Sequence, residues 1–171
     1  MATSGRPVAL ITGASAGIGA ALAREAANDG HDLVLVARRR EPMEALAAEL
    51  KSTGAEITVI PADLSRPGAA GALMKTVEQS GLAIDTLINN AGLGDTGRFD
   101  QENPERILSM LQVNIIALTE LNPAGVAADG GAQAWQGPAS CVPSCIPARS
   151  WHGSILCNQV LRAELRPLNR P

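Results

Sequence analysis

The chain has 171 residues, 46% of them hydrophobic, and a formal net charge of −3 at pH 7. This length fits one domain with a sizeable core. The mild acidity argues against nucleic acid as a partner, because phosphate binding needs clustered Lys and Arg. No apolar run approaches the ~20 residues of a membrane span, so no membrane partner is expected. The chain contains no Tyr, which excludes any mechanism that needs a tyrosine acid or base from this chain.

The amino terminus and the cysteines indicate the cellular compartment of the protein. Residues 1–6 lack the apolar segment of a signal peptide, so we expect a cytoplasmic protein. Three Cys, an odd number, argue against a disulfide framework. The sequence gives no reason to predict a metal site.

The first half of the regular region contains two strand–helix units. Residues 8–11 form a short apolar run typical of a strand buried on both faces, and a helix with apolar residues at four-residue spacing follows from Ile18. That helix is expected to end at residues 28–30, which include a glycine stop signal. Residues 32–37 predict the second strand, and residues 41–53 predict the second helix.

Two further units follow. Residues 57–60 predict the third strand, and a third helix is expected to end near Gly81. Residues 84–88 predict the fourth strand. Asn103 and Pro104 then have the residue types of an N-cap and a first helical position, so a fourth helix should begin there. Its apolar positions include Ile107, Leu108, Leu111, Ile115 and Leu118.

Strands that alternate with helices predict right-handed βαβ units, and hence an α/β fold with a doubly wound parallel sheet. We assign this domain to residues 1–121. Residues 122–171 contain all three Cys, both Trp, six of the 11 Pro and only two acidic residues. This break in composition predicts a separate, irregular tail.

A glycine-rich loop, residues 12–19, joins the first strand to the first helix. Glycines allow a tight turn and close approach to a pyrophosphate, which the free N–H groups of the helix then bind. The alternative is an ordinary turn of small residues. The position of the loop in a βαβ unit favours nucleotide binding.

The second strand ends in three consecutive arginines, residues 38–40. A sheet that prefers NAD places an acid there, about 20 residues after the loop, to bind the ribose diol. The guanidinium of Arg38 instead suits the 2′-phosphate of NADP. The alternative is a solvated basic run at the start of a helix.

Two short polar motifs follow the third and fourth strands. Asp63 can accept a hydrogen bond from an adenine amino group, although it can equally be an N-cap. Residues 89–92, Asn-Asn-Ala-Gly, are small enough to pass close to a bound cofactor, and Asn can fix backbone groups of neighbouring strands. These residues alone would suit a plain turn.

Together these motifs resemble the short-chain dehydrogenase/reductase family over residues 7 to about 121. Val113 and Asn114 complete the resemblance, which implies a Rossmann-type fold, strand order 3-2-1-4, a nicotinamide cofactor and hydride transfer to a carbonyl or from an alcohol. With that cofactor, Arg38 favours NADP(H) over NAD(H). The residues that fall on cofactor-binding positions are Thr12, Gly13, Ser15, Gly17, Ile18, Gly19, Arg38, Asp63, Leu64, Asn90, Ala91 and Gly92.

The resemblance also implies catalytic residues. Asn114 falls on the family's catalytic Asn, which holds a water in a proton relay; the alternative is a helix-interior Asn bonded to backbone. The family further needs a Ser, and a Tyr whose pKa a Lys four residues later lowers. This chain has no Tyr, and no Lys follows Lys75. The fold is therefore predicted to be incomplete, with about four βα units and the fourth strand at an edge, which puts homo-oligomerisation in question.

We hypothesise that the tail is translated out of frame. When each codon loses its first base and borrows one from the next, Trp151 becomes Gly and Gln159 becomes Lys or Arg. Ile155 and Leu156 can each become Tyr, and Val142 can become Ser. The shifted frame thus permits the family's Ser and Tyr-x-x-x-Lys at suitable spacing. The alternatives are a different C-terminal segment and a disordered tail of biased composition.

Overall fold

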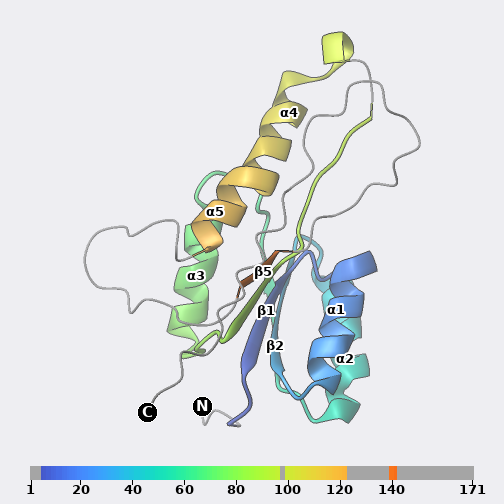
Figure 1. Cartoon of the computed structure of the whole chain (residues 1–171), viewed down its shortest axis with the longest axis vertical. Helices are drawn as coiled ribbons and strands as arrows, with labels where there is room; N and C mark the ends of the chain where they lie inside the picture. The colour runs from blue at the N-terminus through green and yellow to red at the C-terminus, as the bar shows by residue number, and fades with distance from the viewer. Residues whose placement is uncertain (1–4, 97–98, 123–138, 142–171) are drawn as a thin grey trace, which may run out of the picture.

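The computed structural model describes residues 5–96, 99–122 and 139–141. A parallel sheet lies at its centre (Figure 1). The strands are β1 (Val8–Thr12), β2 (Asp32–Ala37), β3 (Ile57–Pro61), β4 (Thr86–Asn89) and β5 (Ala139–Cys141), in the order β3-β2-β1-β4-β5. The first four strands confirm the predicted Rossmann-type order, 3-2-1-4.

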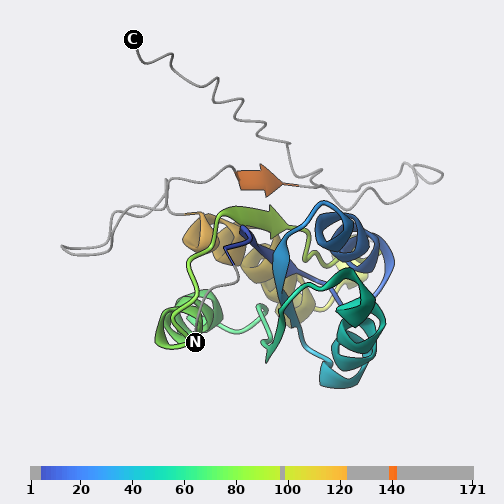
Figure 2. The same ribbon diagram turned by 90° about the horizontal axis from the view of Figure 1, so that it is seen from below.

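Helices cover both faces of the sheet, as the view from below shows (Figure 2). Helices α1 (Gly17–Asn28) and α2 (Arg40–Leu50) pack on one face, and α3 (Ala69–Gln79) packs on the other. Successive residues of β1 point to opposite faces, so Leu10 joins the cluster with α3 while Ile11 joins the cluster with α1 and α2. This two-sided burial explains why the strands are apolar along their whole length.

The second predicted helix is divided in the structure. α2 ends at Leu50, and a 3-10 turn, η1 (Lys51–Thr53), completes the predicted span. Gly54 follows with φ of 75°, a left-handed conformation that glycine adopts without steric cost.

The fourth predicted helix is also divided. A 3-10 turn, η2 (Phe99–Gln101), precedes α4 (Pro104–Leu111), and the chain continues through a π-helix, η3 (Gln112–Ala117), into α5 (Leu118–Leu121). The core takes Val113, Ala117 and Leu121, while several expected apolar positions are exposed, namely Leu108, Leu111, Ile115 and, beside them, Ile116. Leu108 and Leu111 lie in α4, before the π-helix begins. No helix of the described ranges is long and apolar enough to cross a membrane.

The edge of the sheet differs from the prediction. Residues 139–141 were expected to be irregular, and β4 was expected to lie at the edge, but β5 pairs in parallel with β4, with Ala139 opposite Leu87. The expectation that β4 is unpaired is therefore wrong. A strand of three residues without an apolar run gives almost no sequence signal, since its backbone alone makes the pairing. Apart from Asn122, the rest of the predicted tail lies outside the described residues.

Candidate functional site

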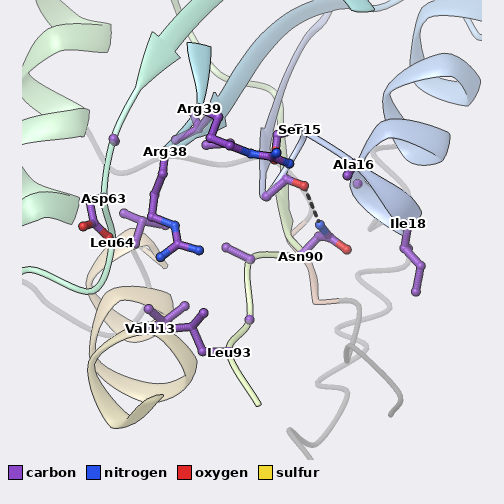
Figure 3. Close-up of a pocket in the computed structure, with 17 residues that line it drawn as sticks. Ser15, Ala16, Ile18, Arg38, Arg39, Asp63, Leu64, Asn90, Leu93 and Val113 are labelled. Carbon is purple, nitrogen blue, oxygen red and sulfur yellow. Dashed lines mark hydrogen bonds between the residues drawn. The ribbon is translucent and has the colours of Figure 1, made fainter. Parts of the chain in front are cut away.

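The carboxyl ends of the parallel strands form one edge of the sheet, where open α/β folds bind ligands. A cleft of about 400 Å³ lies there (Figure 3). The predicted site residues that line it are Gly13, Ser15, Ile18, Gly19, Arg38, Asp63, Leu64, Asn90, Ala91 and Gly92. Gly17 instead lines a crevice between α1 and α2, while Thr12 and Asn114 line neither space.

Gly13 and Gly19 let the loop pack directly against the segment after β4. A Cβ on Gly13 would lie 2.8 Å from Asn90 Nδ2 and 2.9 Å from the Cα of Ala91. A Cβ on Gly19 would overlap the carbonyl of Gly13 and the same Asn90 nitrogen. These two glycines are thus required for packing inside the protein, in addition to any approach of a ligand.

Thr12 and Asn90 lock the loop to β4. The buried hydroxyl of Thr12 accepts hydrogen bonds from the backbone N–H groups of Asn90 and Ala91, both at 3.0 Å. In return, Asn90 Nδ2 donates to the carbonyl oxygens of Thr12 (2.9 Å) and Gly13 (3.4 Å). Thr12 was predicted as a cofactor-binding residue, and the structure places it behind the cleft lining, where it positions the residues that do line it.

The first turn of α1 offers unsatisfied N–H groups to the cleft. Its N-cap, Ala16, has no side chain that can accept a hydrogen bond, and the first turn contains no acidic residue. Such a terminus favours an anion, because the helix dipole adds to the free N–H donors. Ile18, in that turn, belonged to the predicted apolar face, but its side chain is 47% exposed and lies at the cleft (Figure 3).

The three arginines after β2 have different surroundings. Arg38 and Arg39 line the cleft, where Arg38 extends toward Leu93 and Val113 and Arg39 toward Ser15 (Figure 3). Within the described ranges, neither guanidinium has a hydrogen bond or salt bridge. Arg40 points elsewhere and pairs with Glu44 on α2, at 3.3 Å. Among the described residues, two cations without a hydrogen bond or salt bridge therefore remain at the cleft.

Asp63 carries a stabilised negative charge at the same cleft. The hydroxyl of Ser65 donates to Asp63 Oδ1 at 2.7 Å, and this bond is the main reason that the pKa of Asp63 lies below its usual value. The Ser65 N–H and the charges of Arg38 and Arg66 lower the pKa further, against an opposing effect of burial. The alternative prediction of an N-cap is wrong, since α3 begins at Ala69 with Gly68 as its cap.

Asn114 lies within the π-helix η3 and fixes the segment after β4. Its Oδ1 accepts from the backbone N–H of Leu93 at 2.9 Å, and its Nδ2 donates to the carbonyl of Leu93 at 2.7 Å. The predicted alternative, an Asn bonded to backbone, therefore describes its side chain.

Sequence reasoning missed several lining residues. Arg39 was part of the recognised basic run, so its proximity to Arg38 could have indicated it. Leu93 gave no signal, because an apolar residue at that position fits a core equally well, and Val113 was noted only as part of the family resemblance. Within the part of the chain that the structure describes, no group of three or more His, Cys, Asp or Glu side chains could hold a metal ion.

Comparison with known proteins identifies the family to which this chain belongs. The family model described as short chain dehydrogenase matches residues 7–128. The chain belongs to the short chain dehydrogenase family. A chicken (Gallus gallus) relative, dehydrogenase/reductase SDR family member 11, is 38% identical over 114 residues, which are 66% of this chain and 45% of that protein.

Solved structures of the family are similar in fold. A short-chain dehydrogenase from Sphingobium yanoikuyae in complex with NADPH is 44% identical, with a TM-score of 0.63 over 67% of this chain and 45% of that one. An alcohol dehydrogenase from Thermococcus sibiricus complexed with 5-hydroxy-NADP is 35% identical, with a TM-score of 0.63 over 70% of this chain and 52% of that one. The chain thus spans about half the length of the relatives it matches.

Proposed function

We propose that residues 7–121 are the cofactor-binding half of a short-chain oxidoreductase and that they bind NADP(H) in preference to NAD(H). The observation that carries this proposal is the pair Arg38 and Arg39, two cations without a hydrogen bond or salt bridge in the described ranges, beside the uncapped first turn of α1. Relatives in complex with NADPH and 5-hydroxy-NADP support it.

The lining residues fit the parts of such a dinucleotide. The first turn of α1 would hold the pyrophosphate on its free N–H groups. Leu64, Leu93 and Val113 form an apolar surface beside Arg38 that suits a flat adenine ring (Figure 3). Asp63, whose lowered pKa keeps it charged, would accept from the adenine amino group.

The residues after β2 favour the phosphorylated cofactor. β2 ends at Ala37, and the next residue, Arg38, stands where a sheet that prefers NAD places an acid for the ribose diol. A 2′-phosphate adds two negative charges, which a guanidinium binds with charge-assisted hydrogen bonds.

The bound nicotinamide would supply or accept a hydride. The residues of this chain would bind and orient it, and Asn114 would act in the family's proton relay. Its carboxamide is hydrogen-bonded at both ends to the backbone of Leu93, which holds this side chain in place. The chain has no Tyr and no Lys after Lys75. We therefore expect cofactor binding without carbonyl reduction, as in a non-catalytic nucleotide-binding remnant.

The tail beyond residue 121 is proposed to be an out-of-frame reading of the family's catalytic segment. Sequencing the coding region around codon 122 tests this directly. A shifted frame that encodes Tyr-x-x-x-Lys opposite residues 155–159 is the expected result, and an intact alternative frame without that motif contradicts it.

Fluorescence titration of the purified 171-residue chain with NADPH tests the proposed function. We expect saturable binding, and weaker binding of NADH. A parallel assay with NADPH and a panel of ketones and aldehydes should give no turnover above buffer. Measurable turnover would contradict the assignment as a non-catalytic chain, and absence of any NADPH binding by folded protein would contradict the proposed function itself.

A further inference from the structure

Residues 91–96 follow β4, and the first three of them line the cleft; we call this stretch the wall segment. It is fastened at three points. The backbone N–H of Ala91 donates to Thr12 Oγ1, and Asn114 makes two hydrogen bonds with the backbone of Leu93. At its far end, the carboxylate of Asp95 forms an ion pair with Arg106 of α4.

Both oxygens of the Asp95 carboxylate have a partner. Asp95 Oδ2 meets Arg106 Nε, while Asp95 Oδ1 accepts from the backbone N–H of Thr96 at 2.9 Å. The Asp95 side chain is only 21% exposed, against 63% for Arg106. Both carboxylate oxygens are therefore occupied, and the aspartate is held from two directions.

The position of Arg106 calls for such a partner. It is the third residue of α4, where a cation opposes the positive end of the helix dipole. Asp95 comes from a different segment and places a carboxylate at that end of the helix. The pair thus offsets an unfavourable charge on α4 and joins the wall segment to the helix at the same time.

We propose that the Asp95–Arg106 pair is a positioning device for cofactor affinity: it holds the wall segment against α4 so that Ala91, Gly92 and Leu93 keep their places in the cleft. This rests on the proposed function, since the cleft must bind a dinucleotide. The pair makes no contact with Arg38, so its loss should weaken NADPH and NADH binding by the same factor.

The test uses the whole chain with D95N, R106Q and the charge swap D95R/R106D. The control is E49Q, which removes the bidentate Arg24–Glu49 pair between α1 and α2, outside this cleft. We expect D95N and R106Q each to weaken the binding of both cofactors about three- to tenfold, with an unchanged ratio of the NADPH and NADH dissociation constants. The swap should restore affinity to within about twofold, and E49Q should stay within about twofold.

Hydrogen exchange of the free proteins separates this proposal from the proposed function. The amides of Leu93 and Thr96 should exchange faster in D95N and R106Q than in wild type and E49Q, and the swap should restore protection. Unchanged exchange at both amides, or cofactor affinities that match those of E49Q, would overturn the role of the pair. If wild type binds neither cofactor, the proposed function fails, and with it the link from the pair to affinity.

Discussion

The two ends of the sheet are both rich in charged and polar residues, but they use them differently. At the amino ends of the strands, Arg6 Nε donates to the carbonyl of Gly30 at 2.8 Å and lies 3.9 Å from Asp32. Asp32 Oδ1 accepts from the N–H of Glu56, and Asp85 accepts from the N–H of Val8, both at 2.8 Å.

At the carboxyl ends, the first turn of α1 lacks a side-chain cap, and Arg38 and Arg39 have no hydrogen bond or salt bridge among the described residues. The groups named at the amino end have partners inside the protein and therefore stabilise the fold. The carboxyl end keeps donors and cations that a ligand can use. Charge alone does not distinguish the two ends; the presence or absence of internal partners does.

The largest predicted effect comes from the glycine packing at the carboxyl end. Gly19→Ala would push a methyl group into Gly13 and Asn90, so we expect a loss of about 2–3 kcal/mol in unfolding free energy and loss of NADPH binding. The new Cβ of Gly71→Ala in α3 would have no atom within 4 Å, so this substitution should raise the unfolding free energy by up to about 1 kcal/mol. Urea unfolding of both variants checks this; equal stability of the two would contradict the packing argument.

A substitution at the amino end should separate stability from binding. Asp32→Ala leaves the N–H of Glu56 without its acceptor and Arg6 without its carboxylate, at a cost of about 1–3 kcal/mol. NADPH affinity of the folded fraction should change by less than about twofold, since no residue near Asp32 lines the cleft. A large loss of affinity at unchanged stability would show that the two ends are coupled.

Ionic strength should affect the carboxyl end selectively. We expect NADPH affinity to fall about three- to tenfold between low and high salt, and NADH affinity to fall less, because only NADPH brings a 2′-phosphate to the arginines. Titrations at matched pH across a salt series measure this. Equal salt dependence of the two cofactors would remove the electrostatic basis for NADP preference.

The smallest effect concerns Asp63. Its pKa is lowered mainly by the Ser65 hydroxyl, so its contribution to stability is present above the unfolded pKa of about 4 and is lost as pH falls through the lower folded value. Ser65→Ala should raise the pKa of Asp63 back toward its ordinary value. The pH range over which the stability contribution of Asp63 is lost should then become narrower. An NMR titration of the Asp63 carboxyl carbon checks it, and an unmoved pKa would show that the arginines dominate.

Sequence periodicity was sufficient for the elements with continuous apolar runs. Residues 32–37 coincide with β2, and the order of β1 to β4 agrees with the prediction. It failed at two places: the fourth helix buries Val113, Ala117 and Leu121 and exposes the expected positions, and β5 pairs through backbone groups that no side-chain pattern records.

The candidate site, too, could be predicted from the sequence only in part. The glycine loop, Arg38 and residues 89–92 could be predicted because their chemistry is visible in the residue types. The positioning of Leu93 by Asn114, and of Asp95 by Arg106, depends on contacts between segments far apart in the sequence. Spacing along the chain does not encode those contacts.

The most direct test of the central claim compares Arg38 with Arg40, two neighbouring arginines of which only the first lines the cleft. The measurement is the ratio of NADH to NADPH dissociation constants in Arg38→Gln and Arg40→Gln. Loss of a charge-assisted phosphate contact should lower that ratio about 10- to 100-fold in Arg38→Gln and leave it near the wild-type value in Arg40→Gln. Equal ratios in both variants would contradict NADP(H) recognition by this cleft.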